Sequence, residues 1–364
     1  MADSASAPVW ASDAVVDLLV EADIAHVAFN PGATLRGIHD SLVNHRRDGP
    51  GIVLCAHEAI SVSVAHGYAK ATGRPMAVLL HDVVGLQHAS MAVYNAWCDR
   101  VPVMLIGGTG PMSTARRRPW IDWIHTANVQ AELVRNYVKW DDQPADVASI
   151  PRAFARSLAF ARAQPPGPVY LCLDAGLQED ELTGAPWPSL SAFPAASPPA
   201  AAEADLDALA ERLRTAALPV LISDYAGDTP TGYDALVALA ELLQAPVIDC
   251  GARHNMPVAH ELNFSELAEV LGAADLVLGF EVQDLAGALA GTRQPAGADG
   301  PAPAAVHVAA GHLRVRSWTH DIGELAPLEQ LLTASAETAL PALVSRLRHR
   351  PPEPALLAAR RAQL

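Results

Sequence analysis

The feature that most constrains the fold is a regular alternation of short apolar runs with helical patterns along the first half of the chain. Apolar runs that predict strands lie at Ala25–Phe29, Ile52–Ala56, Met76–His81, Pro102–Gly107, Leu133–Trp140 and Pro168–Leu173. Helical patterns separate them, near Ser12–Ala22, Thr34–Asn44, Ala59–Ala71, Gln87–Cys98 and Asp146–Arg162. Strands that alternate with helices of this length indicate βαβ units and a parallel sheet.

The second half repeats this architecture after a change in composition. A segment rich in Pro, Ala and Ser, from Gly184 to about Ala202, cannot build a core and predicts a linker. Further strands are expected at Pro219–Ser223, Pro246–Asp249, Ala274–Phe280 and Ala304–Ala309, with helices before Ala217, at Tyr233–Leu243 and at Leu328–Arg348. We therefore predict an α/β protein with two doubly wound parallel-sheet domains, at 1–182 and 204–349, joined by a linker at 183–203 and followed by a tail without an element at 350–364.

Composition narrows the classes of partner. Hydrophobic residues make up 51% of the 364 residues and charged residues 18%, which suits buried parallel strands. A net charge of −15 without a basic stripe argues against nucleic acid as a partner. No apolar stretch reaches the length of a membrane span, and the N-terminus has no secretory pattern, so we expect a soluble cytoplasmic protein. The four cysteines lack metal-ligand spacing and are predicted to be small buried hydrophobes, so no metal site is expected.

A single carboxylate stands out at a predicted strand-to-helix junction. In His57-Glu58-Ala59-Ile60, Glu58 stands between the apolar run that ends at Ala56 and the helical pattern that begins at Ala59. Open α/β sheets bind ligands at the carboxyl ends of their strands, and a glutamate held there among apolar neighbours can exchange a proton near neutral pH. The alternative is a first-turn glutamate that the helix dipole favours, with no further role.

Other polar turns follow neighbouring strands. Phe29-Asn-Pro-Gly-Ala33 follows the first strand, and His81-Asp-Val-Val-Gly-Leu-Gln-His88 follows the third. The carboxyl ends of parallel strands share one edge of the sheet, so these turns are expected on the same side as Glu58.

Together these motifs resemble the pyrimidine-binding domain of thiamine diphosphate enzymes, especially the acetolactate synthase, benzaldehyde lyase and pyruvate oxidase group. The strings HEAISVSVAHGYAKATG and NAWCDRVPVMLIGG carry the resemblance, over roughly residues 10–180. The second block is similar to the Rossmann-like central domain of that group, with LPVLISD, APVIDCGARHNMP and AADLVLGF in the expected order.

The resemblance implies a role for several residues. The glutamate at the position of Glu58 hydrogen-bonds N1′ of the cofactor's aminopyrimidine in that family, which makes Glu58 the expected catalytic residue. This role calls for a carboxyl with a raised pKa in a dry pocket. Pro31, Gly32, Gly85 and His88 are expected to bind the cofactor, thiamine diphosphate, together with Glu58.

This sequence departs from the family pattern after the third strand, where a glycine-rich turn with Thr or Ser is usual. His81 and His88 stand in that segment and either face the pyrimidine or the substrate or simply bond backbone in a loop. His125 falls near an active-site glutamine or histidine of related enzymes, and we retain it as a substrate-facing candidate. Arg116, Arg117 and Arg118 either recognise an anion or form a solvated basic patch.

The family's third domain holds the diphosphate through Mg²⁺, with a Gly-Asp-Gly motif followed by Asn-Asn, and neither half appears in these 364 residues. Gly297-Ala-Asp-Gly300 is the nearest approach. We therefore expect a shorter partner subunit that carries this domain and its Mg²⁺, in a heterotetramer of two chains of each kind. Some relatives hold FAD in the central domain, but nothing in residues 204–348 identifies such a site.

The function expected from this resemblance is the larger subunit of a split enzyme that decarboxylates a 2-oxo acid and then joins the product to an acceptor carbonyl, as acetolactate synthase does. The alternatives are a split 2-oxo acid decarboxylase without carboligation, and a non-catalytic scaffold or regulatory subunit. The identity of the substrate cannot be read from the residues.

Overall fold

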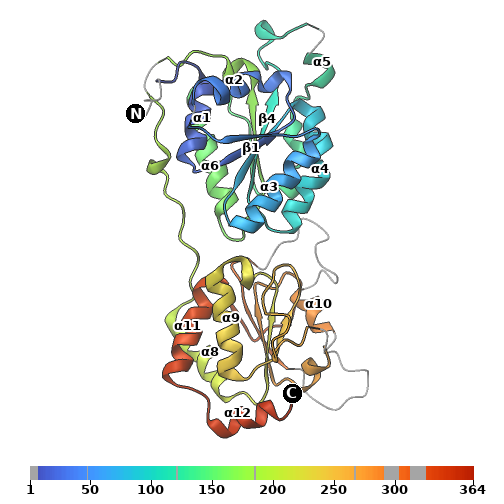
Figure 1. Cartoon of the computed structure of the whole chain (residues 1–364), viewed down its shortest axis with the longest axis vertical. Helices are drawn as coiled ribbons and strands as arrows, with labels where there is room; N and C mark the ends of the chain where they lie inside the picture. Colours follow the sequence, from blue (N-terminus) through green and yellow to red (C-terminus); the bar gives the residue numbers. More distant parts are fainter. Residues whose placement is uncertain are drawn as a thin grey trace. The chain divides into compact units, whose positions relative to one another are not determined.

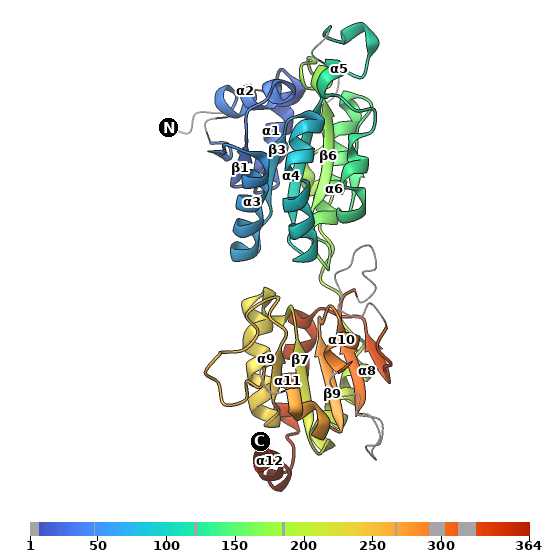
Figure 2. The same cartoon turned by 90° about the vertical axis from the view of Figure 1, so that its right-hand side faces the viewer.

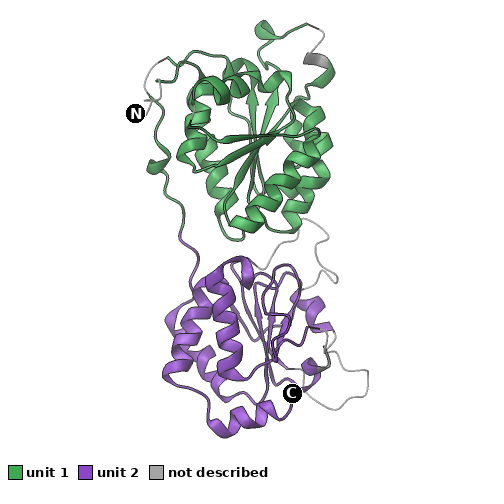
Figure 3. Ribbon diagram, in the orientation of Figure 1, with its two compact units in different colours: residues 1–196 green, residues 197–364 purple. Residues whose placement is uncertain are grey.

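The structure is a computed structural model that describes residues 7–46, 48–119, 122–183, 186–265, 268–290, 303–311 and 325–364. The chain divides into two compact units, residues 1–196 and 197–364 (Figure 3). Each unit contains one parallel sheet covered by helices, and the predicted α/β class is confirmed.

The sheet of the first unit has six strands in the order β2-β1-β3-β4-β6-β5, and every pair is parallel. The strands are β1 (His26–Phe29), β2 (Gly51–Leu54), β3 (Met76–Leu80), β4 (Val103–Thr109), β5 (Asp141–Asp142) and β6 (Val169–Asp174). The order places β1 between β2 and β3, so the three segments that follow these strands lie next to one another.

Helices cover both faces of this sheet, with α3 and α4 on one face and α1 and α6 on the other (Figures 1 and 2). The helices are α1 (Ala11–Glu21), α2 (Arg36–Asn44), α3 (Glu58–Thr72), α4 (Asp82–Cys98), α5 (Asp122–His125), α6 (Ile150–Arg162) and α7 (Ala175–Gln178). Alternate residues of the central strands enter two separate cores: Leu79 packs with α1, α2 and α6, whereas Val78 and Leu80 pack with α3 and α4. This period of two is the pattern that a strand buried on both faces requires.

The helix that begins at Glu58 has clear end signals. His57 is its N-cap and accepts a hydrogen bond from the backbone N–H of Ala59 through Nδ1 at 3.2 Å. Gly73 ends the helix with φ of 69°, a left-handed conformation that glycine adopts without steric cost. Glu58 is therefore fixed as the first helical residue, directly after the turn from β2.

Two predictions for this unit are wrong. Leu133–Trp140 is not a strand: one 3₁₀ turn, Gln130–Leu133, ends at its first residue and a second, Arg135–Tyr137, lies within it, because its buried residues Val134 and Val138 are spaced by four rather than by two. The short edge strand is instead β5. The predicted loop His81–His88 is also wrong, since α4 already begins at Asp82, which places both Gly85 and His88 on a helix.

The second unit has a five-stranded parallel sheet in the order β11-β10-β9-β7-β8. Its elements are β7 (Pro219–Ser223), β8 (Val247–Asp249), β9 (Leu276–Phe280), β10 (Ala304–Val308), β11 (Gln330–Leu332), α8 (Glu203–Thr215), α9 (Pro230–Leu243), α10 (Leu285–Ala290), α11 (Ala336–His349) and α12 (Pro354–Arg361). The larger core lies between the sheet and α8, α9 and α11, and a smaller one lies on the α10 face.

The end of this unit differs from the prediction. The expected helix Leu328–Arg348 begins only at Ala336, because residues 330–332 pair with β10 as an edge strand. The tail 350–364 contains helix α12, and the side chain of Arg360 is completely buried. The guanidinium donates to the backbone carbonyls of Leu213, Ala216 and Leu243, so an arginine that reads as a surface residue joins α12 to the ends of α8 and α9.

Two further observations concern cysteines and membrane spans. Cys172 is buried as predicted, Cys55 and Cys98 are half-buried, and Cys250, at the end of β8, is exposed against the prediction. Within the described residues, the helices lack the length and apolar character needed to span a bilayer.

Candidate functional site

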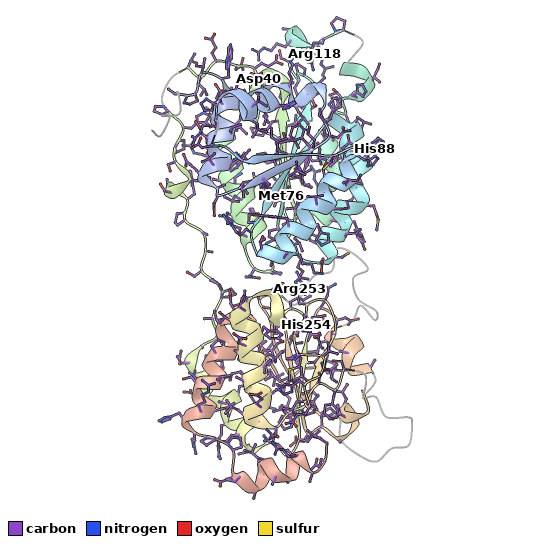
Figure 4. The ribbon with its side chains drawn as sticks, viewed as in Figure 1. Asp40, Met76, His88, Arg118, Arg253 and His254 are labelled. Carbon is purple, nitrogen blue, oxygen red and sulfur yellow. The ribbon has the colours of Figure 1, made fainter. Side chains whose placement is uncertain are left out.

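Three polar side chains gather at the carboxyl edge of the first sheet because their strands are neighbours. Asn30 follows β1, Glu58 follows β2 and His81 follows β3. The adjacent helix α4 adds His88, which is labelled beside that helix in Figure 4, whereas Met76 begins β3 at the opposite edge of the sheet. This edge is where open α/β sheets place their ligands.

The carboxylate of Glu58 is at the centre of this group. Its residue is only 5% exposed, and Asn30 Nδ2 donates to Oε1 at 3.2 Å. His88 Nδ1 lies 3.3 Å from Oε2 and carries the proton of this contact, because an ionised carboxylate only accepts. Gly85 makes room for the side chain: a Cβ added there would lie 3.3 Å from Glu58 Cγ.

These contacts correct the expectation of a raised pKa. Burial raises the pKa of Glu58, but hydrogen bonds from its own backbone, from Asn30 and from His88 outweigh burial and hold the pKa below its ordinary value. The expectation was wrong because it considered only the apolar neighbours in sequence, whereas the donors come from β1 and α4. The chain itself therefore keeps this carboxylate ionised.

His81 is held against the turn that follows β1. Its Nδ1 accepts from the backbone N–H of Thr34 at 3.4 Å and lies 2.9 Å from Thr34 Oγ1, so Nε2 carries the proton of the neutral ring. Gly32 permits this approach, since a Cβ at Gly32 would lie 2.3 Å from His81 Cγ. Burial, and then the charge of His125, lower the pKa of His81, which favours the neutral ring.

His125 comes to the same end of the sheet from α5. The centroids of the His81 and His125 rings are 5.5 Å apart. Next to His125, Thr126 Oγ1 donates to Asp82 Oδ2 at 3.2 Å, and Asp82 is 1% exposed. The two predicted substrate-facing residues, His81 and His125, therefore lie next to each other.

The remaining predicted residues occupy the margin of this site. Pro31 is exposed and precedes Gly32 in the turn after β1. His88, an expected loop residue, lies on α4 with its ring stacked on His57 at a centroid distance of 4.8 Å. Sequence reasoning missed Asn30 and Thr34, although both lie beside the Pro-Gly turn that it singled out. The missing signal was the strand order, which places this turn between Glu58 and His81.

Two histidines flank the Glu58 carboxylate, although no metal site was expected from the sequence. The ligand atoms of His57, Glu58 and His88 lie within 4.8 Å of one another, close enough in principle for one ion. Two of these groups are already engaged, since His57 Nδ1 accepts from Ala59 and His88 Nδ1 donates to Glu58. We therefore assign these atoms to the capping of α3 and to the support of the carboxylate.

In the basic segment after β4, Arg116 has a structural role. Arg116 Nη1 donates to the carbonyl of Gly176 at 2.9 Å, and its other terminal nitrogen pairs with Asp180. Arg116 thus fixes its segment to α7. The segment Gly297–Gly300 lies outside the described residues.

The second unit has a pocket of about 460 Å³ at the carboxyl ends of β7, β8 and β9. Asp224, Cys250 and Asp284 are among its lining residues. Carboxylates disfavour the diphosphate of a dinucleotide, and FAD binding stays an unsupported prediction.

In sequence, the chain is similar to thiamine diphosphate enzymes. Residues 9–133 match the family of the thiamine pyrophosphate enzyme, N-terminal TPP binding domain. The chain is 31% identical over 242 residues to a benzoylformate decarboxylase of Pseudomonas aeruginosa, covering 65% of this chain and 44% of the relative. It is 26% identical over 257 residues to the acetolactate synthase large subunit of Lactococcus lactis, covering 70% and 43%. The chain thus spans less than half the length of these curated relatives.

Solved structures show the same fold over almost the whole chain. The benzoylformate decarboxylase of Polynucleobacter necessarius superposes with a TM-score of 0.75 at 21% identity, covering 93% of this chain and 61% of that one. A thiamine diphosphate-dependent 4-hydroxybenzoylformate decarboxylase of Rhodococcus jostii gives 0.73 at 23% identity, covering 92% and 62%. The resemblance to thiamine diphosphate enzymes and the two-domain α/β class are both confirmed.

Proposed function

We propose that this chain is the larger subunit of a two-component thiamine diphosphate-dependent enzyme that decarboxylates a 2-oxo acid and joins the product to an acceptor carbonyl. The single observation that carries the proposal is the Glu58 carboxylate, buried at the carboxyl edge of the sheet and held by Asn30 and His88. It lies in the segment that matches the TPP-binding family.

The donor set fits an aminopyrimidine. Glu58, once protonated, can donate a hydrogen bond to a ring nitrogen, and the glycines at positions 32 and 85 keep side chains out of its surroundings. When bound, thiamine diphosphate supplies a thiazolium carbon that adds to a carbonyl and accepts the electrons released by decarboxylation. With the ring bound, Glu58 would donate its proton to the ring nitrogen and take it back, and Asn30 fixes the orientation of the carboxyl group. A bound ring would exclude water from Glu58 and so raise its pKa toward the range useful for proton exchange.

A partner that supplies the diphosphate site, with Mg²⁺, would dock beside this carboxylate. The elements around Glu58 expose large apolar side chains: Leu54 of β2 is 66% exposed, Ile60 and Val64 of α3 are 49% and 38% exposed, and Met91 of α4 is 65% exposed. Ile60 and Val64 are four residues apart and share one helix face. In both views α3 and α4 lie side by side (Figures 1 and 2). Apolar side chains that gather on neighbouring elements favour a protein partner.

The test is reconstitution. The chain is co-expressed with a shorter polypeptide that carries Gly-Asp-Gly followed by Asn-Asn, and 2-oxo acid consumption is measured with thiamine diphosphate and Mg²⁺. Turnover by the pair and not by either chain alone would support the split enzyme. A tight complex that neither binds thiamine diphosphate nor consumes 2-oxo acids would contradict it and favour the scaffold.

A second candidate is decarboxylation without carboligation. It is favoured by the 31% identity to a benzoylformate decarboxylase and by the match to a probable 2-ketoarginine decarboxylase of Pseudomonas aeruginosa, 27% identical over 287 residues. The product decides between the two: an aldehyde released in equal amount to CO₂ indicates simple decarboxylation, whereas a hydroxyketone indicates carboligation.

A further inference from the structure

We propose that Asp82 is a positioning residue that fixes the segment carrying His125 over the His81 end of the site, through the hydrogen bond from Thr126. This inference deepens the proposed function and rests on it only where activity is the readout.

The backbone of Asp82 is the first indication. Its φ is 49°, in the left-handed region that residues other than glycine rarely adopt, and Asp and Asn are the least unfavourable of them. The residue is 1% exposed, so its carboxylate is also removed from water. Strain and desolvation together need compensating contacts in the folded protein.

The two carboxylate oxygens have separate contacts. Oδ1 accepts from the backbone N–H of Val83 at 3.0 Å, which closes the turn between β3 and α4 locally. This contact alone would be a purely structural role. Oδ2 accepts from Thr126 Oγ1 at 3.2 Å, across a separation of 44 residues. The second contact therefore joins the strand end to a distant segment.

On the C-terminal side, this segment is next held at Gln130, which is 1% exposed and donates to the carbonyl of Gly108 at 2.9 Å, so Thr126 is the contact nearest to His125. Helix α5 is only four residues long, and a single turn has no stability of its own. Ile124 is 54% exposed and Val129 is 48% exposed, so the apolar residues on both sides of Thr126 contribute little burial. A polar anchor at Thr126 is then important for the order of this segment.

The position of His125 follows from the anchor. His125 precedes Thr126 directly, and its ring centroid lies 5.5 Å from that of His81. His81 is fixed by Thr34 and Gly32, independently of Asp82's side chain. Loss of the Thr126 contact should therefore release His125 while His81 stays in place.

The first experiment measures backbone hydrogen exchange of the full chain by mass spectrometry. Thr126→Val removes the hydroxyl, keeps the side-chain shape and leaves the Asp82 turn intact. We expect exchange of the peptide spanning 124–129 to be about three- to tenfold faster, the effect of losing one hydrogen bond, with β3 and α4 unchanged. Asp82→Gly should also speed exchange of the 124–129 peptide and, because it removes the contact between Oδ1 and the Val83 N–H, exchange of the first turn of α4 as well. The matched control is Thr72→Val, whose hydroxyl bonds Tyr68 at the far end of α3.

Unchanged exchange of the 124–129 peptide in Thr126→Val would overturn the proposal, and this result needs no activity. The second experiment uses the reconstituted pair. Thr126→Val should lower kcat/KM to the same extent as His125→Ala, and the double variant should fall no further, because both changes remove the same group. Faster exchange with wild-type kinetics would overturn the positioning role and leave the proposed function standing. Failure of the wild-type pair to consume any 2-oxo acid would instead contradict the proposed function.

Discussion

Asn30 Nδ2 donates to Glu58 Oε1 at 3.2 Å, a contact between the ends of two neighbouring strands that are 28 residues apart in sequence. Together with the hydrogen bonds from the Glu58 backbone and from His88, this bond keeps the Glu58 carboxylate ionised, and it holds the group in one orientation before any ring is bound. Substitution of either Glu58 or Asn30 should therefore change the properties of the site.

Glu58→Gln should remove turnover while preserving the fold. The amide keeps the size of the side chain but cannot hold or release the proton, and general acid–base groups contribute about 10²–10⁴-fold to rates. We expect kcat of the reconstituted pair to fall by roughly that factor. Hydrogen exchange of unit 1 should stay as in the wild type, and a variant with wild-type kcat would contradict the assignment.

Asn30→Ala should change how stability depends on pH. Because the folded-state pKa of Glu58 is lowered, its ionisation stabilises the fold above the unfolded pKa of about 4.3, and this contribution is lost as pH falls through the lower folded value. Without Asn30 we expect a loss of about 1–2 kcal/mol in the free energy of unfolding at pH 7, shrinking as the pH falls through that window.

Urea unfolding at several pH values measures this difference. Asn44→Ala is the matched control, since Asn44 donates to Asp40 on the exposed surface of α2, and its effect should be small at every pH. If the loss of unfolding free energy in Asn30→Ala does not vary with pH, the ionisation of Glu58 is not the cause of that loss.

Two glycines of the helices beside the site should respond in opposite ways to alanine. Gly67 has open space around its added Cβ, so Gly67→Ala should stabilise α3 by about 0.5–1 kcal/mol. At Gly85 the methyl group would lie 3.3 Å from Glu58 Cγ and 3.4 Å from the Leu80 carbonyl carbon, tighter than an ordinary contact. Gly85→Ala should therefore gain no stability and should weaken thiamine diphosphate binding by the pair. Equal stabilisation by both changes would show that Glu58 has room to move.

The sequence predicted the architecture well because strand and helix periods are local properties. The buried strands β3 and β4, and the start of α3 one residue before the predicted Ala59, follow from neighbours in the chain. The site was predicted less completely. The donors to Glu58 depend on β1 lying between β2 and β3, which no local pattern specifies. For the same reason, the lowered pKa of Glu58 and the contact between Asp82 and Thr126 could not be predicted.

The exposed apolar residues beside the site should be required for assembly with the partner. Ile60→Asp and Met91→Asp each place a charge where we propose an apolar interface, and burying an unpaired charge is costly. We expect either change to abolish co-purification of the shorter subunit while the chain itself stays folded. Val43→Asp is the control, because Val43 is 54% exposed on α2. Undiminished assembly of both site-face variants would place the interface elsewhere.

Arg360 should be essential for the stability of the second unit. Burial lowers its pKa to about 10, with the charge of Asp275 opposing, and the guanidinium still remains charged at neutral pH. It satisfies carbonyls at the ends of α8 and α9, where the helix dipoles also favour a cation. Arg360→Met should leave these carbonyls without their donor. We expect it to lower the free energy of unfolding of the second unit by about 2–4 kcal/mol. Arg361→Met, which removes only a surface bond to Gln244, should change stability by less than about 0.5 kcal/mol. The measurement is hydrogen exchange, followed separately in each unit. In Arg360→Met, protection should fall in α8, α9 and α12 and stay unchanged in unit 1. Equal protection in the two variants would show that the Arg360 side chain does not hold α12.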